Sequence, residues 1–595
     1  MNSAVRLILG CALFAVAAPA VAQGSAHDRL FQLFKDSDEA YLKRNPLQAM
    51  YRGDYRYADR LGDLFSDAHY QAEKTAAEHD LAALGAIPRA ELSADDQLAF
   101  DVFEFSTKDT LRGLQPDLLP LTEARPMNHF YGLHTEYPTV SSGQGGAPFA
   151  TVADYENGLK RNQDFARNVD EAIAQWKKGE AEGVVDTKLT VRNMIEQLDN
   201  QLRLKPEDSP YWGPLRAFRG GISPADQARL TGEYRRSIVT VIYPALQRMQ
   251  AFLKTEYLGH ARDGVGLLAM KGGDRLYNYQ VQSSTTLPMT PEQIHQLGLS
   301  EVARINKEFE KVRVEVGFKG TLQQFFDYMR TDKKFQPKTR VQLQNDFYRI
   351  RTAVDAKVPQ YFSLVPKTPL EIRPYPAYRE KFEAGGSYDA GTPDGKRPGT
   401  FYFNAYDLPA RFIWEETTLF LHEGEPGHHF QISLAQEDKS LPSFMRFGGN
   451  TAYVEGWALY AETLGYDMGF YADPYQRFGT LNDEMLRAMR LVVDTGIHAK
   501  GWTRDQSIAY FLANSGESRT DATAEVERYI AIPSQAVAYK LGSLTIQRLR
   551  DKAKAALGPK FDIREFHAQV LGSGALPLSI LEAKIDRWIA TKKAA

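Results

Sequence analysis

The chain has 595 residues, which is more than one simple hydrophobic core supports and predicts two or more lobes. Its 43% hydrophobic and 25% charged residues are typical of a soluble globular protein. The formal net charge is −3, unlike the basic surface of a nucleic-acid-binding protein. We therefore expect no nucleic-acid partner.

The first residues have the pattern of a secretory signal peptide. Arg6 supplies a positive charge, Leu7–Ala18 is apolar, and Ala20–Ala22 forms an A-x-A cleavage site before Gln23. The apolar stretch is too short for a typical membrane span. We expect residues 1–22 to be removed, leaving a periplasmic or secreted chain, 23–595, with no stable membrane insertion. A buried N-terminal helix is the alternative interpretation.

The only cysteine is Cys11. Ile8–Gly10 before it faintly resembles a lipoprotein cleavage box, but only about four apolar residues precede the cysteine, too few for a signal sequence. Cleavage after Ala22 is favoured and would remove Cys11. The mature protein would then have no disulfide, thiol nucleophile or thiolate zinc site, so His, Asp or Glu must hold any metal.

The chain beyond the signal is predicted to be mainly helical. Apolar residues recur at three- and four-residue spacing from His27 to about Leu204, and Thr290–Gln293 has the pattern of a capped helix start. A Gly/Pro/Asp-rich loop is expected at 384–400, followed by an aromatic strand at Thr400–Asn404. Further helices are expected at Leu408–Glu437, Thr451–Leu464, Leu481–His498, Arg504–Asn514 and Asp521–Tyr529. This arrangement predicts a small sheet that lines one wall of a cleft between helical lobes.

The strongest chemical signal is the segment 421–431, which contains three of the 12 histidines. His422-Glu423 opens the zinc-peptidase motif H-E-x-x-H, in which two histidines on one helix face bind zinc and the glutamate acts as general base. Here Pro426 occupies the position of the second histidine. On an ideal helix, His428 would lie about 120° around the axis and about 9 Å further along it, so both histidines could not share one metal.

Pro426-Gly427 offers a solution to this mismatch. Proline disrupts a helix and glycine accepts unusual backbone angles, so a bulge or kink here can return a histidine to the metal. We favour His428, because the segment then equals H-E-x-x-H with Pro-Gly inserted; His429 is the alternative.

Catalytic zinc needs a third protein ligand, and Glu455 is the best candidate because 27 residues leave room for a second helix to pack back. Glu462, two turns further along the same helix face, is better suited to orient a ligand. A lone His-Glu pair usually lies on a helix surface. Three histidines within an apolar helix are costly to bury unless they bind something.

Four blocks carry a resemblance to a known family: H-E-G-E-P-G-H-H-F-Q at 422–431, Y-V-E-G-W-A-L-Y-A-E at 453–462, R-L-V-V-D-T-G-I-H-A-K-G-W at 490–502 and P-S-Q-A-V-A-Y-K-L-G at 533–542. They resemble a large bacterial family with the pattern H-E-x-x-P-G-H-H, long labelled a domain of unknown function. That family looks like a relative of the gluzincin zinc metallopeptidases, such as angiotensin-converting enzyme and the helical oligopeptidases.

The resemblance implies a mainly α, two-lobed metallopeptidase-like fold over 23–595, with a deep substrate channel and a catalytic part at about 400–545. It implies one zinc ion per chain bound by His422, His428 and Glu455, with Glu423 as general base. It does not decide between His428 and His429, since both belong to the pattern.

Other residues in or near these blocks are candidates for substrate contacts. Tyr539 or Tyr529 can stabilise the oxyanion of a tetrahedral intermediate, and Arg528 can bind a peptide carboxylate. Lys540, His498 and His429 are further substrate-binding candidates, although each of these residues is also common in ordinary packing. Asp494 and His498 share a helix face and can form a supporting pair.

The sequence therefore predicts a zinc-dependent peptidase that acts on short peptides through a metal-activated water. A zinc hydrolase of non-peptide amides or esters would use the same site. A non-catalytic periplasmic binding protein with a structural metal is the alternative from another class. A serine hydrolase and a dinucleotide enzyme are disfavoured, because G-x-S-x-G and a strand-linked G-x-G-x-x-G are not found.

Overall fold

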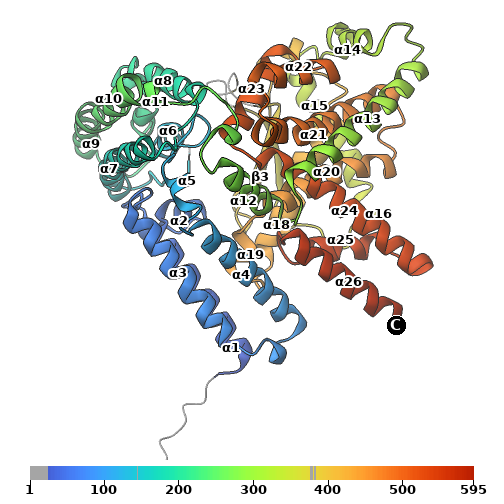
Figure 1. Ribbon diagram of the computed structural model, residues 1–595, viewed down its shortest axis with the longest axis horizontal. Helices are drawn as coiled ribbons and strands as arrows, with labels where there is room; N and C mark the ends of the chain where they lie inside the picture. The colour runs from blue at the N-terminus through green and yellow to red at the C-terminus, as the bar shows by residue number, and fades with distance from the viewer. Residues whose placement is uncertain (1–23, 144, 376–379, 381–383, 595) are drawn as a thin grey trace, which may run out of the picture.

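The structure is a computed structural model that describes residues 24–143, 145–375, 380 and 384–594. The expected signal peptide and Cys11 lie outside the described residues. Within the described part, the protein is mainly α-helical with a small three-stranded sheet. Figure 1 shows the helices of the N-terminal half grouped on one side of the molecule and the C-terminal helices on the other.

The helices of the first half pack partly on each other and partly on helices of the second half. They are α1 (Ala26–Arg44), α2 (Pro46–Tyr51), α3 (Asp67–Gly85), α4 (Ala94–Gly113), α5 (Leu119–Glu123), α6 (Leu133–Ser141), α7 (Val152–Glu182), α8 (Lys188–Leu202), α9 (Pro224–Ser237), α10 (Tyr243–Phe252), α11 (Leu258–His260) and α12 (Gly273–Thr285). One hydrophobic core draws all its buried members from 50–261, and it is centred on the fully buried Trp176 of α7.

The second half of the chain is also built mainly of helices. Its helices are α13 (Pro291–Glu315), α14 (Leu322–Thr331), α15 (Arg340–Asp355), α16 (Val358–Tyr361), α17 (Glu416–Glu423), α18 (His428–Glu437), α19 (Ser443–Phe447), α20 (Thr451–Asp467), α21 (Pro474–Lys500), α22 (Arg504–Asn514), α23 (Arg519–Ala531), α24 (Gln535–Leu557), α25 (Ile563–Leu571) and α26 (Leu578–Ala594). The expected capping box at Thr290 is confirmed at the start of α13, where the Thr290 side chain accepts from Gln293 N–H.

Short single-turn helices complete the framework. They are η1 (Tyr55–Tyr57), η2 (Arg89–Glu91), η3 (Pro206–Asp208), η4 (Pro210–Leu215), η5 (Ile238–Ile242), η6 (Leu253–Tyr257), η7 (Leu267–Ala269), η8 (Lys333–Phe335), η10 (Leu408–Ala410) and η11 (Gly558–Lys560).

The sheet has the strand order β1 (Leu370–Pro374), β3 (Gly399–Phe403), β2 (Gly386–Asp389). β3 pairs in parallel with β1 and antiparallel with β2, and the expected aromatic strand is confirmed as β3. The prediction of a loop over 384–400 is wrong at Gly386–Asp389, which forms strand β2. A glycine-containing segment reads as a loop, but Gly386–Asp389 pairs along the edge of β3, and α17 contacts β2.

Two helix boundaries also differ from expectation. The helix expected at Leu408–Glu437, with an interruption at Pro426-Gly427, begins only at Glu416, because 411–415 is non-helical. The expected interruption separates α17 from α18 at Gly424–Gly427. The apolar pattern of 408–415 reflects packing of Phe412 and Trp414 rather than helix formation: these rings stack with centroids 4.7 Å apart. α20–α23 begin and end within a few residues of their predicted bounds, except that α21 starts seven residues earlier at Pro474.

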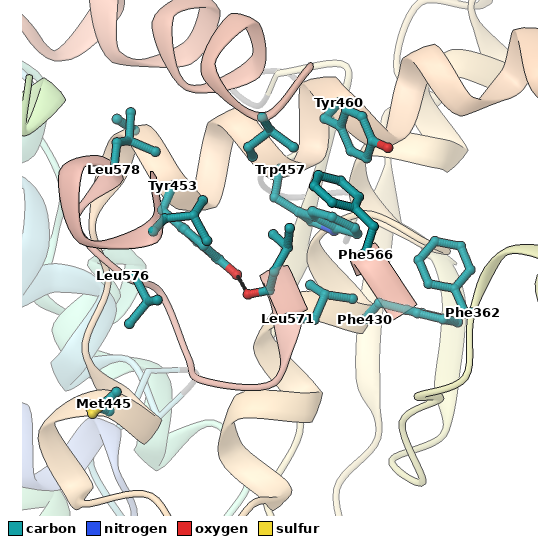
Figure 2. Packing of buried hydrophobic residues seen from close by; sticks show 14 of the residues in the cluster. Phe362, Phe430, Met445, Tyr453, Trp457, Tyr460, Phe566, Leu571, Leu576 and Leu578 are labelled. Atoms are coloured by element: carbon teal, nitrogen blue, oxygen red, sulfur yellow. Dashed lines mark hydrogen bonds between the residues drawn. The ribbon is translucent and has the colours of Figure 1, made fainter. Parts of the chain in front are cut away.

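Helix α20 lies at the centre of the second half. Tyr453, Trp457 and Tyr460 project from it into an aromatic core with Phe430 and Phe566, as Figure 2 shows. The Tyr453 hydroxyl donates a 2.5 Å hydrogen bond to the backbone carbonyl of residue 570. Because α20 is buried on nearly every face, the polar side chains that it carries must have partners inside the protein.

Candidate metal centre

The candidate site is built where α17 ends and α18 begins. α17 carries His422 and Glu423 in its last turn, and Gly424 ends the helix with φ −95° and ψ −117°. Gly427 then lies against the end of α17, where a Cβ atom would come within 1.9 Å of the His422 carbonyl oxygen. Only glycine permits this approach. The expected kink is therefore a complete break between two helices, which places His428 beside His422.

The break is anchored by α20. Trp457, which is fully buried, donates a 2.9 Å hydrogen bond from its indole nitrogen to the Pro426 carbonyl oxygen. Figure 2 shows this ring between Tyr460 and Phe430. Two residues before Trp457, Glu455 reaches the two histidines from the same helix. The packing of α20 thus sets the positions of both the linker and the carboxylate.

Three ligand-type side chains meet at this point. Each of His422, His428 and Glu455 offers one ligand atom, and these three atoms lie within 4.8 Å of one another. Glu455 Oε2 is 3.7 Å from His422 Nε2 and 3.5 Å from His428 Nε2, and the two imidazole rings are perpendicular, with centroids 4.8 Å apart. The three residues are those that the sequence singled out as metal ligands.

A second carboxylate holds His422 from behind. Glu462 Oε1 lies 2.7 Å from His422 Nδ1, and its side chain is almost completely buried. A proton on Nδ1 satisfies this bond, so Nε2 is the nitrogen that faces Glu455 and His428. The expectation that Glu462 would support a ligand rather than act as one agrees with this geometry.

The charges of the carboxylates dominate the electrostatics. Burial by itself lowers the pKa of His422, but hydrogen bonds to Glu455 and Glu462 outweigh it and raise that pKa to about 10. Burial raises the pKa of Glu455, and the two histidines more than reverse this effect and hold it well below its usual range. The group therefore keeps an ionised carboxylate and attracts positive charge between the imidazoles.

The geometry and the donor types fit a zinc ion. Zinc binds imidazole nitrogen and carboxylate oxygen at about 2.0–2.2 Å, so ligand atoms of a tetrahedral site lie about 3.4 Å apart. The two Glu455 distances of 3.7 and 3.5 Å are close to this value. Three protein ligands would leave one tetrahedral position open, which is the pattern of catalytic rather than structural zinc sites.

His429 is directed elsewhere. Its Nδ1 lies 3.0 Å from the hydroxyl of Tyr388 on β2, and it is not part of the three-residue group. Burial, the largest effect, lowers the pKa of His429 to about 4, so this ring is neutral at physiological pH. The contact with Tyr388 brings the small sheet next to the candidate site. Of the two alternatives for the second ligand, the geometry favours His428.

The predicted tyrosines occupy different environments. Tyr539 is half-buried on α24, its hydroxyl accepts a 3.3 Å hydrogen bond from Gln535, and both burial and the Glu455 charge raise its pKa. Tyr529 is fully buried on α23, donates its hydroxyl to Glu525 and accepts from Arg490 Nε at 3.1 Å. Only Tyr539 has Glu455 among its electrostatic neighbours.

Arg528 and Lys540 both lie beside carboxylates of the protein itself. Arg528 Nε is 3.8 Å from Glu525 Oε1. Lys540 is fully buried, with its ammonium 2.6 Å from Glu484 Oε1 and 3.0 Å from Glu301 Oε2. This internal ion-pair network occupies the lysine, so the structure gives no support to its expected contact with substrate.

His498 is also part of the framework. The backbone N–H of Leu267 donates to its Nδ1 at 3.1 Å, and its Nε2 lies 2.9 Å from the Tyr529 carbonyl oxygen. The side chain is fully buried and not part of the three-residue group. Asp494, its expected partner, instead accepts from Tyr277 and Ser534. The packing interpretation of His498 therefore agrees with its contacts.

Sequence reasoning did not identify Arg490 and Arg487, which lie on α21. Arg487 Nη2 is 3.8 Å from Glu462 Oε1, and Arg490 stacks on Tyr539 with its Cζ 4.5 Å from the ring centroid. Their spacing of three residues places both on one helix face, but this spacing is common on surface helices. Only the packing of α21 reveals that the face is turned inward.

A large cavity of about 1540 Å³ lies elsewhere in the molecule. Its lining combines α1, α3 and α4 with residues 145–150, the loop 389–393 and the segment 444–451. The three ligand-type residues do not line it. The cavity reaches Thr451, the first residue of α20, and so approaches the helix that carries Glu455.

Fold and site together define a mainly helical protein with a buried group of two histidines and one glutamate. Residues 46–585 match the family described as "Bacterial protein of unknown function (DUF885)", and the chain belongs to this family. No curated protein matches the chain. Within the described residues, no helix combines the length and the apolar character needed to cross a membrane.

Two solved structures are similar over nearly the whole chain. One is described as that of a "putative lipoprotein" from Colwellia psychrerythraea; it is 28% identical, with a TM-score of 0.87, and the match covers 96% of this chain and 100% of that one. The other, described in the same terms and as of unknown function, is from Shewanella oneidensis. It is 18% identical, with a TM-score of 0.73, and the match covers 93% and 99% of the two chains. This second similarity concerns the fold alone.

Proposed function

We propose that this protein is a zinc-dependent hydrolase that cleaves peptide bonds in short peptides, related to the gluzincin metallopeptidases. His422, His428 and Glu455 would hold one zinc ion per chain. The observation that carries the proposal is the convergence of these three ligand atoms within 4.8 Å, together with the 2.7 Å contact that turns His422 Nε2 toward them. Two imidazoles and one carboxylate, with a further carboxylate behind one imidazole, are the residue types of a zinc site and its supporting contacts.

Glu423 is the proposed general base. It follows His422 directly at the end of α17, it is largely buried, and its charge contributes to the raised pKa of His422. A zinc ion bound here would lower the pKa of its water and polarise the scissile carbonyl. Glu423 would accept the proton of the attacking water and pass it to the leaving amine.

Tyr539 is the preferred donor to the oxyanion. Its raised pKa keeps the hydroxyl protonated at neutral pH, and Glu455 is among the charges that act on it. Tyr529 is less suitable, because its hydroxyl is already used in the bond to Glu525. A preorganised hydroxyl can stabilise a tetrahedral intermediate without reorganisation during the reaction.

The enclosed position of the site favours small substrates. The side chains of His422 and His428 are 7% and 11% exposed, so a folded protein could not place a peptide bond against them. We propose that the two groups of helices form lobes on either side of a substrate cleft. The large cavity next to the start of α20 supports an access route from the N-terminal side.

The two rival functions make different predictions. A hydrolase of non-peptide amides or esters would use the same residues, and a substrate panel separates it from a peptidase. A structural metal would be closed by four protein ligands, with His429 as the available fourth. The contact of His429 with Tyr388 favours the open, catalytic arrangement.

The first test is elemental analysis of the purified mature protein beside His422→Ala. The exposed His79→Ala is the matched control. We expect about one zinc per chain in the wild type and in the control, and its loss in His422→Ala. No metal in the wild type after incubation with zinc would overturn the proposal. The next step is a peptide panel with Glu423→Gln, which should retain zinc and lose about 10²- to 10⁴-fold in turnover.

We also propose that the protein is exported. The N-terminal signal pattern supports this, and the 28% identical structure is described as that of a "putative lipoprotein". Fractionation followed by N-terminal sequencing tests the proposal and its cleavage site. A mature chain beginning at Gln23 is the expected result, whereas an intact N-terminus in the cytoplasmic fraction would contradict export.

A further inference from the structure

A second cluster of charged residues lies next to the candidate metal centre, on α21. Arg487 Nη2 is 3.8 Å from Glu462 Oε1, the carboxylate that holds His422. Arg490 follows three residues later and therefore lies on the same face, one helical turn further along. The α21 face that supports the metal centre thus continues directly to Arg490.

Arg490 is buried with part of its guanidinium unused. Its side chain is only 7% exposed; Nε donates to the Tyr529 hydroxyl at 3.1 Å and Nη2 to Glu525 Oε2 at 3.0 Å. Nη1 is buried and has no hydrogen-bond partner among the described residues. A buried, unpaired N–H group of a cation is costly, which suggests that a ligand completes its contacts.

Arg528 on α23 repeats this pattern from the other side. Its Nε is 3.8 Å from Glu525 Oε1, too far for a hydrogen bond, and its Cζ is 5.5 Å from the Tyr529 ring centroid. Both Nε and Nη2 are buried and lack a hydrogen-bond partner within the part of the chain that the structure describes. Two guanidinium groups thus lie beside the single carboxylate of Glu525.

Tyr539 connects this cluster to the candidate metal centre. α20 and α24 cross where Gly456 meets Gly542, so closely that a Cβ on Gly456 would lie 2.5 Å from the Gly542 Cα. Glu455 directly precedes one glycine, and Tyr539 lies within one turn of the other. Because the Arg490 guanidinium stacks 4.5 Å from the Tyr539 ring centroid, Arg490 lies one side chain beyond the proposed oxyanion donor.

We propose that Arg490 and Arg528 form the subsite that binds the C-terminal carboxylate of a peptide substrate, so that cleavage occurs close to that terminus. This inference rests on the proposed function and assigns its substrate class. Two buried guanidinium groups whose N–H groups lack partners among the described residues are suited to an anionic ligand. The planar N–H edges of arginine also match a carboxylate.

The test measures binding rather than turnover. The probe is a fluorophore-labelled Gly-Ala-Ala tripeptide with a free C-terminal carboxylate, compared with its C-terminal amide, on zinc-incubated Glu423→Gln protein. We expect the acid to bind at least about ten-fold more tightly than the amide, since a charge-assisted bidentate pair is lost with the amide. Equal affinities for the acid and the amide would overturn the subsite.

Variants of Arg528 assign the preference to the cluster. Arg528→Gln, in the Glu423→Gln background, should bring the acid-to-amide ratio close to one, whereas Arg519→Gln, on the exposed start of the same helix, should leave it unchanged. If Arg528→Gln does not fold, Arg528→Lys serves instead, and its point charge should retain only part of the preference. An unchanged ratio in either folded Arg528 variant would overturn the proposal.

A third peptide separates the two sources of a carboxylate. Gly-Ala-Asp amide carries only a side-chain carboxylate, and we expect it to bind as weakly as the neutral amide. Binding as tight as that of the free acid would overturn the assignment to the chain terminus. The results distinguish failure of the proposed function from failure of the subsite. If the protein prefers the acid but never binds zinc, the proposed hydrolase function is overturned. If the protein hydrolyses peptides without preferring the acid, only the proposed subsite is overturned.

Discussion

His422 and Glu462 are joined by a 2.7 Å contact between Nδ1 and Oε1, deep between α17 and α20. This contact determines which nitrogen of the imidazole can face Glu455 and His428. It also connects α21 to the site, because Arg487 lies 3.8 Å from the same oxygen. The orientation of one candidate ligand is therefore set by side chains from two other helices.

Replacing Glu462 should weaken metal binding without removing a ligand. We expect Glu462→Gln to lower zinc affinity about 10- to 100-fold, because the amide no longer fixes the tautomer and basicity of His422. Competition with a chromophoric chelator measures this affinity. The exposed Glu196→Gln is the control. Unaltered affinity in Glu462→Gln would show that the carboxylate does not support a metal ligand.

The two tyrosines should respond differently to loss of their hydroxyls. Tyr539→Phe should lower kcat by about 10²- to 10³-fold while zinc content and stability stay close to wild type, as expected for an oxyanion donor. Tyr529→Phe should instead reduce stability by about 1–3 kcal/mol, because it removes one hydrogen bond from the buried Arg490 and one from Glu525. Steady-state kinetics and thermal unfolding of both variants check this, and the reverse pattern would exchange their roles.

Gly427 should tolerate no side chain. In Gly427→Ala the new Cβ would meet the His422 carbonyl oxygen at 1.9 Å, so α18 must move away from α17. We expect loss of stoichiometric zinc and a lower melting temperature. Gly232→Ala, at a helical position with nothing within 4 Å, should be neutral or stabilising by about 0.5–1 kcal/mol. Normal zinc content in Gly427→Ala would contradict the proposed close approach.

His498 should contribute to acid unfolding. Burial, the largest effect, lowers the pKa of His498 to about 3, whereas an unfolded histidine titrates at about 6.5. Between these values the unfolded chain binds one more proton, so stability is complete above pH 6.5 and is lost as the pH falls toward 3. The full difference corresponds to about 5 kcal/mol.

His498→Gln therefore has a specific expected signature. Proton uptake on unfolding near pH 5 should decrease by about one per molecule, even though the variant is less stable at pH 7. Denaturant unfolding at several pH values measures this slope, with the exposed His79→Gln as the control. The same slope in His498→Gln and wild type would show that His498 does not titrate as a buried group.

Local sequence patterns determined much of this protein. Helix-forming spacing, the capping box at Thr290 and the aromatic strand at 400–404 depend on near neighbours, and all three have their counterparts in the structure. The two histidines and Glu455 could also be selected, because metal-ligand residue types at this spacing restrict the geometry. Boundaries were less predictable, since the packing of Phe412 and Trp414 outweighs the apolar pattern that suggested a helix there.

Only the tertiary structure decided which side chains surround the group formed by His422, His428 and Glu455. The choice of His428 over His429 depends on Gly427 meeting the His422 carbonyl and on Tyr388 holding the other ring. Lys540 and His498 are engaged within the framework by helices more than 30 residues away in the chain, and Arg490 faces inward for the same reason. Residue type and spacing reveal which groups can do chemistry, whereas long-range packing determines which of them face one another.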